Sequence, residues 1–393
     1  MGIIYLPAIA VYLIGLLIFS MKVVHVIEPF ASGVAFFVKS LAETMPHDTH
    51  FVVHGERKDV LSADEVKKLF PRENVRFVRW KSVSRSINPV KDLMALRELY
   101  TILRRFKEKN LADVVHLHSS KSGFLGRFAC RLAGIENVLY TPNGASFLSG
   151  KNFFVRGFYR QLEKLGNKWG GKVVCCSESE FEAYRKIGID ATYINNGINL
   201  AEQVLKNVIK DTDKFTIVTS GRIVSQKNPA LFNEIAAYFN GLNQFQFTWI
   251  GDGEDKDLLT SPNIKITGWQ HEEKAKELIE NCDVYISTSQ YEGLSFAALQ
   301  ALSFKKPVLL SDCVGNTDVV KQGMNGDLFD NSDDAISKIL KYYNNADMLS
   351  VMGDYSRELC EQEFDRNNNF SNYRQLYSIA AINFNYNKPI SIA

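Results

Sequence analysis

Short continuous apolar runs alternate along this chain with longer segments whose apolar residues recur at helical spacing. Such runs predict strands buried on both faces, and the segments between them predict helices that cover a parallel sheet. In the first half of the chain, strands are predicted at residues 23–27, 50–53, 75–78, 114–117, 137–140, 172–175 and 192–194. Helices are predicted between them at residues 34–44, 90–109, 123–132, 153–169 and 178–186.

A polar segment at residues 197–213 interrupts this pattern, which then restarts. Strands are predicted at residues 215–220, 245–250, 264–267, 284–287 and 307–310, and helices at residues 229–239, 272–281, 295–304, 333–343 and 348–362. The chain is therefore predicted to be an α/β protein with two doubly wound, Rossmann-like domains that face each other across a cleft. The predicted parts are an apolar extension at 1–20, domains at 21–200 and 201–365, and a segment at 366–393 whose helix, 369–384, returns to the first domain.

The composition is that of an ordinary globular protein, with 46% hydrophobic and 23% charged residues and a net charge of +2. This balance does not indicate a nucleic-acid partner. The charge is uneven, because residues 72–109 carry eleven Lys or Arg against four Asp or Glu. The segment is either a solvated helix face or a surface that docks on anionic lipid.

The cysteines and histidines do not form a metal-binding pattern. No pair of cysteines has C-x-x-C spacing, and no H-E-x-x-H motif is present. Several cysteines lie in apolar runs, which favours reduced, buried thiols in a cytosolic protein over disulfides or a zinc site. No metal or cofactor is expected. The six cysteines are Cys130, Cys175, Cys176, Cys282, Cys313 and Cys360.

Residues 2–20 are uncharged, mostly apolar and nearly long enough to span a bilayer. They could be a membrane anchor, a signal-like segment, or translated upstream sequence with Met21 as the natural start. No basic region precedes the apolar run and no clean cleavage site follows it, which argues against a signal peptide. Met21 followed by an apolar strand is typical of the start of a cytosolic α/β enzyme, and we favour this third interpretation.

The segment that indicates chemistry most strongly begins at Glu292, directly before Gly293 and an apolar helix. A helix N-terminus attracts phosphate, and a carboxylate accepts hydrogen bonds from sugar hydroxyls. A second cluster follows the strand at 215–220, where Gly221 and Arg222 are succeeded by Lys227. Glycine lets the backbone approach a ligand, and the two cations suit a diphosphate, although surface cations are also common.

Taken in order, these motifs resemble those of the retaining glycosyltransferases of family four, which have the two-domain GT-B fold. The resemblance covers roughly residues 21–377, and its motifs are strong as an ordered set. In the second half they are Gly221-Arg222 with Lys227-Asn228, Gly251-Asp252-Gly253, Gly268-Trp269, and Glu292-Gly293-Leu294 with Gln300. In the first half they are Ser32-Gly33-Val34, His116-Leu117-His118 with Lys121, Tyr140-Thr141-Pro142-Asn143-Gly144, Cys176-Ser177-Glu178-Ser179 and Ile194-Asn195-Asn196-Gly197-Ile198.

The resemblance implies a role for each matching residue. Arg222 and Lys227 would bind the donor diphosphate and stabilise the leaving group, and Glu292 would contact the donor sugar. Gly293, Leu294, Ser295 and Phe296 would contact sugar and phosphate through backbone N–H groups, and Gln300 would hold the ribose. Further donor contacts would come from Gly33, Gly221, Gly251 and Trp269, and acceptor contacts from Ser32 and Lys121.

Two positions depart from the family pattern. Gln300 stands where relatives have a second Glu, and Asn143 stands where many have His near the reacting carbon. Both amides can hydrogen-bond a sugar, but neither can take up a proton at neutral pH. His118 could substitute for the missing imidazole, although a packed residue at a strand end, like His116, is the favoured interpretation.

The sequence thus leads to the hypothesis of a retaining hexosyltransferase, peripheral on the inner face of the bacterial plasma membrane. It would move a sugar from a nucleotide-diphosphate donor, UDP-linked above others, to a polyprenyl-diphosphate-linked glycan during capsule, exopolysaccharide or O-antigen synthesis. Two alternatives stay open: a catalytically weakened partner subunit of a glycan assembly complex, and a nucleotide-sugar 2-epimerase, for which no set of carboxylates and His is evident.

Overall fold

A computed structural model describes residues 20–56, 62–149, 152–202 and 214–386. Most of the apolar extension and much of the polar interruption fall outside the described residues. The chain divides into two compact units, each formed from several segments. Unit 1 comprises Met1–Tyr140, Gly166–Lys172 and Ser371–Ala393, and unit 2 comprises Thr141–Leu165 and Val173–Phe370.

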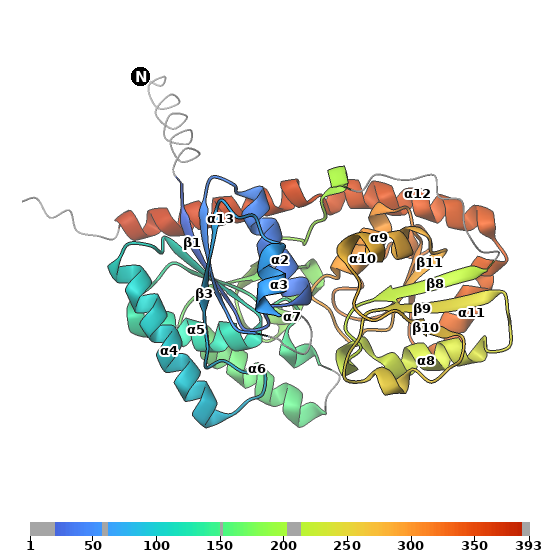
Figure 1. Cartoon of the computed structure of the whole chain (residues 1–393), viewed down its shortest axis with the longest axis horizontal. Helices are drawn as coiled ribbons and strands as arrows, with labels where there is room; N and C mark the ends of the chain where they lie inside the picture. The colour runs from blue at the N-terminus through green and yellow to red at the C-terminus, as the bar shows by residue number, and fades with distance from the viewer. Residues whose placement is uncertain (1–19, 57–61, 150–151, 203–213, 387–393) are drawn as a thin grey trace, which may run out of the picture. The chain divides into compact units, whose positions relative to one another are not determined.

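The first half of the chain supplies a seven-stranded sheet with the order β3-β2-β1-β4-β5-β6-β7. Strand β1 is central because its apolar residues are buried on both faces, and it pairs in parallel with β2 and β4 (Figure 1). The strands are β1 (Lys22–Ile27), β2 (Thr49–His54), β3 (Val75–Arg79), β4 (Val114–His118), β5 (Val138–Thr141), β6 (Lys172–Cys175) and β7 (Ala191–Tyr193). The helices of this half are α2 (Ser32–Thr44), α3 (Ala63–Lys68), α4 (Pro89–Glu108), α5 (Ser120–Ala133), α6 (Phe153–Asn167) and α7 (Glu178–Lys186).

The second half supplies a six-stranded parallel sheet with the order β10-β9-β8-β11-β12-β13. Its strands are β8 (Phe215–Ser220), β9 (Phe245–Ile250), β10 (Ile264–Ile266), β11 (Val284–Ser287), β12 (Val308–Ser311) and β13 (Gly326–Phe329). Its helices are α8 (Pro229–Tyr238), α9 (Glu272–Glu280), α10 (Phe296–Ser303), α11 (Ser332–Tyr343) and α12 (Ala346–Glu363), and α13 (Arg366–Tyr386) follows.

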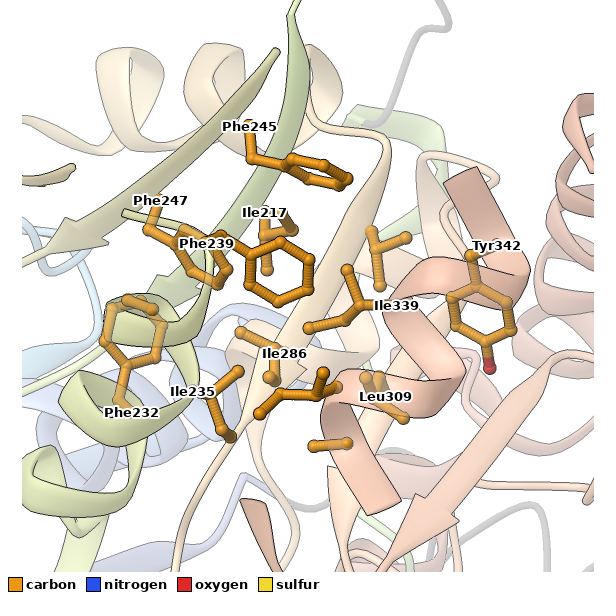
Figure 2. Close-up of a cluster of buried hydrophobic side chains, with 14 of the residues drawn as sticks. Ile217, Phe232, Ile235, Phe239, Phe245, Phe247, Ile286, Leu309, Ile339 and Tyr342 are labelled. Carbon is orange, nitrogen blue, oxygen red and sulfur yellow. The ribbon is translucent and has the colours of Figure 1, made fainter. Parts of the chain in front are cut away.

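An aromatic core lies between this second sheet and helices α8 and α11 (Figure 2). Phe232 on α8 and Phe239, which directly follows α8, contact Phe247 on β9, and Ile339 and Tyr342 enter from α11. All five side chains are fully buried, so their transfer from water stabilises the sheet and fixes where its strands end. This core therefore positions the loops after β8 and β11 that carry the predicted site.

The predicted strands and helices are confirmed, with most ends within two residues. Among the described residues, one strand and one α-helix were missed. Strand β13 contains Gly326 and the buried Asp327, so it lacks an apolar run; the carboxylate of Asp327 accepts a hydrogen bond from Tyr342 Oη at 2.8 Å. Helix α3 is only six residues long, but Ser62 and Glu65 form a capping box that the sequence displays.

Four imidazoles lie buried on one face of the first sheet, between its central strands and the helices α2 and α13. His25 on β1 pairs in register with His116 on β4, and His118 follows on the same face. His50 lies on the neighbouring β2. His116 Nδ1 and Tyr377 Oη on α13 are 2.7 Å apart. Both His116 and His118 are therefore packed core residues, as predicted.

Hydrogen bonds link three of these imidazoles in series. The Met45 carbonyl can only accept, so His50 donates to it through Nε2 at 3.3 Å. His50 Nδ1 then accepts from His25 Nε2 at 2.9 Å, and His25 Nδ1 accepts from His118 Nε2 at 3.0 Å. Ring nitrogens of His25, His116 and His118 lie within 4.8 Å of one another. The hydrogen bonds in series explain how His25 and His118 can be buried as neutral imidazoles.

Among the described residues, no helix combines the length and the apolar character needed to cross a membrane. The six cysteines are all free thiols; five are buried and Cys313 is half-buried, in agreement with the prediction of reduced thiols.

Candidate functional site

The candidate site in unit 2 begins at Gly221, directly after β8. Gly221 has φ +144°, and Gly251, which follows β9, has φ +139°. A Cβ atom at Gly251 would lie 2.2 Å from the carbonyl oxygen of Gly221, so only glycine lets the two loops meet. Gly251 also bridges to Gly268, which places the loop carrying the exposed Trp269 beside them.

A short turn, Ser225–Lys227, presents Lys227 next to the end of β8. The Lys227 side chain passes over Gly221, where a Cβ atom would lie 3.2 Å from Lys227 Cε. The turn is fixed to the loop after β11, because Gln226 Nε2 donates to the Tyr291 carbonyl at 3.0 Å. Thr288 Oγ1 donates to the carbonyl of Lys227 at 2.7 Å. Arg222 is half-buried and directly follows Gly221.

An ion pair joins the two predicted catalytic loops. Lys227 Nζ lies 2.6 Å from Glu292 Oε1, and their side chains are only 20% and 9% exposed. The Glu292 backbone N–H donates to the Val314 carbonyl at 2.9 Å, and Gly315 packs against the Glu292 side chain. A partly desolvated ion pair is stronger than a surface pair and fixes both side chains. The structure thus brings together Gly221, Lys227 and Glu292.

The residues after Glu292 lead into α10. Gly293 and Leu294 are buried, and Ser295 caps the helix by accepting from the Ala298 N–H at 3.4 Å. Phe296 begins the helix and Gln300, one turn on, is half-buried. This N-terminus is therefore anchored beside Glu292, where its partial positive charge favours an anion.

The Asn143–Gly144 turn contacts the same loop. A Cβ atom at Gly293 would lie 2.7 Å from the Gly144 backbone nitrogen. Asn143 has φ +54°, in the left-handed region that asparagine tolerates. Its Nδ2 donates to the Thr141 carbonyl at 3.2 Å, and its Oδ1 accepts from the thiol of Cys176 at 3.4 Å. The Asn143 side chain is thereby held within unit 2.

Glu180 on α7 anchors the Asn143–Gly144 turn, and the sequence analysis did not identify it. Its buried carboxylate accepts from the backbone N–H groups of Gly144 at 2.9 Å and Cys176 at 3.0 Å. Burial raises the pKa of Glu180 to about 7. Ser177 caps α7 by accepting from the Glu180 N–H, so the Cys-Ser-Glu-Ser motif was the available signal.

The remaining predicted residues, Ser32, Gly33 and Lys121, lie in unit 1. Ser32 and Gly33 are exposed at the start of α2. Lys121 Nζ lies 2.6 Å from Asp92 Oδ1 and donates to the Ser84 carbonyl at 2.6 Å. The Lys121 ammonium therefore ties α5 to α4 and to the segment that precedes it.

Two family profiles match consecutive parts of the chain. The profile described as "Glycosyltransferase Family 4" matches residues 31–202, and "Glycosyl transferases group 1" matches residues 202–359. The chain belongs to the family-four glycosyltransferases of the GT-B fold. The first profile covers the Asn143 turn and Glu180, and the second covers Lys227 and Glu292, so both halves of the candidate site lie in matched sequence.

Curated relatives of this family-four glycosyltransferase include bacterial sugar transferases. It is 29% identical over 337 residues to the Escherichia coli UDP-Gal:alpha-D-GlcNAc-diphosphoundecaprenol alpha-1,3-galactosyltransferase, covering 79% of this chain and 86% of that protein. It is 22% identical over 298 residues to the Campylobacter jejuni N,N'-diacetylbacillosaminyl-diphospho-undecaprenol alpha-1,3-N-acetylgalactosaminyltransferase, covering 69% and 78%. A protein in the cps region of Klebsiella pneumoniae is 24% identical, over 91% of this chain and 99% of that one.

Solved structures agree with the fold. Anabaena Alr3699/HepE in complex with UDP superposes with a TM-score of 0.71 at 15% identity, covering 91% of this chain and 100% of that one. The lipopolysaccharide outer core galactosyltransferase WaaB superposes with a TM-score of 0.61 at 18% identity, covering 92% and 99%. At these identities the likeness concerns the fold alone.

Replacing Glu180 with Gln should lower the transfer rate of this glycosyltransferase and flatten its pH dependence. The ionised carboxylate accepts backbone N–H bonds, whereas a protonated carboxyl has an O–H where an acceptor is needed. Wild-type activity should therefore fall as the pH drops through about 7. The E180Q variant should be roughly tenfold slower than wild type, which corresponds to about 1.4 kcal/mol of lost positioning. Its activity should show no fall near pH 7. Rate profiles from pH 6 to 8.5 measure this.

The control for this prediction is Glu182→Gln, an exposed position on the same helix. A wild-type step near pH 7 that persists in E180Q would assign the titration to another group.

Proposed function

We propose that this protein is a retaining glycosyltransferase that moves a hexose from a nucleotide-diphosphate donor, UDP-linked above others, to a lipid-linked glycan. The Lys227–Glu292 pair carries the proposal, because it places a cation and a carboxylate beside an anchored helix N-terminus. The cation suits the donor diphosphate and the carboxylate suits the sugar hydroxyls. The named activities of the relatives from Escherichia coli and Campylobacter jejuni support the choice of substrates.

In the proposed reaction, the bond between the sugar anomeric carbon and the diphosphate oxygen breaks as the acceptor oxygen attacks from the same face. The acceptor proton passes to the leaving phosphate, so no side chain is required as a base. Negative charge grows on the diphosphate in the transition state, where Lys227, Arg222 and the N-terminus of α10 stabilise it electrostatically. The donor site needs no metal in this scheme.

The side chains at the two departures from the family pattern keep useful functions. Gln300 can hydrogen-bond a ribose hydroxyl through its amide. Asparagine tolerates the left-handed backbone conformation at position 143, and the hydrogen bond with Cys176 orients its side chain. A positioning role for Asn143 is consistent with a mechanism in which the phosphate receives the proton.

The acceptor is proposed to be a polyprenyl-diphosphate-linked glycan of capsule, exopolysaccharide or O-antigen synthesis, which places the enzyme on the inner face of the bacterial plasma membrane. The structure of α4 supports this placement. Val90, Leu93 and Met94 are 59–70% exposed in its first turns, beside the exposed Lys91 and Arg97. An exposed apolar face with flanking cations suits an anionic membrane surface.

Donor binding is the experiment that tests the proposed function. A panel of nucleotides and nucleotide-sugars is titrated by calorimetry into wild type, Lys227→Ala and the control Lys256→Ala, an exposed position near the Gly251 turn. One nucleotide diphosphate should bind to wild type and Lys256→Ala and at least about tenfold more weakly to Lys227→Ala, because a charge-assisted contact is lost. No binding to wild type across the panel would instead support the partner-subunit alternative.

A further inference from the structure

Helix α6, which is labelled in Figure 1, carries aromatic side chains that are exposed to solvent. Phe153, Phe154 and Phe158 are 68%, 83% and 52% exposed, and Leu165 is 42% exposed. Phe154, Phe158 and Leu165 follow each other at intervals of four and seven residues, so they lie on one face of the helix. Single exposed apolar side chains are common, but three phenylalanines within six residues form a patch that indicates a binding surface.

The charged side chains of α6 that reach solvent are positive. Arg156, Arg160 and Lys164 lie on the helix, and its acidic residue, Glu163, is buried. Arg156 and Arg160 are half-buried and Lys164 is exposed. The charge that α6 presents to water is therefore positive, which suits an anionic surface.

We propose that α6 lies in the interface of an anionic lipid bilayer, with its phenylalanines in the acyl region and its cations at the phosphates. The proposal rests on the proposed function, because a lipid-linked acceptor requires the enzyme to work at that surface. Aromatic side chains on one face and Lys or Arg beside them are the pattern of helices that lie in the plane of a membrane. A neutral partner surface would leave the positive charge of the helix unmatched.

The sequence analysis interpreted the basic segment 72–109, which contains α4, as either a solvated face or a lipid-docking surface, and it did not identify α6. The reason is that α6 contributes few charges to the sequence. Its aromatic residues recur at helical spacing, so the sequence pattern alone does not distinguish them from core residues. Only their exposure in the folded chain shows that this face of α6 is uncovered.

The test is vesicle co-flotation of the full-length protein with phosphatidylglycerol-containing vesicles and with phosphatidylcholine vesicles. Phe154→Ser with Phe158→Ser should weaken binding to the anionic vesicles on the order of 100-fold, because two aromatic side chains are lost from the acyl region. Arg156→Gln with Arg160→Gln should weaken binding at low salt and leave little further salt dependence. Val351→Ser on α12, at 68% exposure, is the matched control and should bind like wild type.

Calorimetric nucleotide binding by the same variants separates this proposal from the donor-site proposal, since no proposed donor contact lies on α6. Variants that bind nucleotide but not vesicles support the docking role of α6. Wild-type vesicle binding by the phenylalanine variant would overturn it. So would a wild-type protein that ignores vesicles but self-associates in sedimentation through these phenylalanines, because the occupant would then be a second copy of the chain.

Discussion

Lys227→Ala should lower the turnover number of this glycosyltransferase by about 10²–10³-fold, the usual cost of removing one preorganised group that stabilises transition-state charge. Two effects add in the same direction. The cation that faces the developing charge on the diphosphate is lost. Glu292, only 9% exposed on its side chain, is left without the Lys227 ammonium 2.6 Å away, and its carboxylate then repels the diphosphate.

A matched series separates these two effects. Lys227→Arg keeps the charge and should retain more activity than Lys227→Met, although its longer, planar group cannot reproduce the contact with Glu292. Lys256→Ala removes an exposed lysine near the same loops and should behave like wild type. Steady-state kinetics with the donor identified by calorimetry gives the split between kcat and KM. Unchanged turnover in Lys227→Ala would remove this residue from the mechanism.

Acidification from pH 8 to pH 5 should destabilise the fold through its buried imidazoles. Burial lowers the pKa of His50 to about 4 and the pKa of His116 to about 3, and the pKa values of His25 and His118 are also lowered by burial. Each of these groups therefore takes up a proton more readily in the unfolded chain. The stabilising neutral state is fully populated above about pH 6.5, and stability falls as the pH drops from there.

The size of this effect follows from the pKa differences. At pH 5, His50 and His116 should each reduce the free energy of unfolding by about 2 kcal/mol. His25 and His118 act in the same direction. Glu180 opposes them, because its raised pKa favours the folded state at low pH by roughly 2 kcal/mol. The net loss is a substantial part of the ~5–15 kcal/mol that stabilises a typical domain.

Urea unfolding at pH 8 and pH 5, followed by circular dichroism, measures this loss. His271→Gln changes an exposed histidine and should leave the pH dependence as in wild type. His118→Leu should unfold more easily at pH 8, because His25 Nδ1 loses its donor, and should lose less stability on acidification. Equal unfolding midpoints at pH 8 and pH 5 would show that the imidazoles are protonated within the fold.

The sequence alone predicted most of the succession of strands and helices along both halves of the chain. Continuous apolar runs such as β8 and β9 can be buried on both faces only in a covered parallel sheet, so their positions follow from local pattern. The short strand β13 was not predicted, because its four residues include Gly326 and Asp327. Glycine at positions 221 and 251 and the Glu292 motif also marked the candidate donor site, because backbone approach and charge are encoded in residue type.

The tertiary structure decided which of these side chains meet. Lys227 and Glu292 are 65 residues apart, and no local rule predicts an ion pair at that separation. The carboxylate of Glu180 and the serial bonding of His50, His25 and His118 likewise depend on strands that are distant in sequence. The exposure of Phe154 and Phe158 follows only from what the fold leaves uncovered. Periodicity fixes local structure, whereas burial, pKa and contact arise from the packing of remote segments.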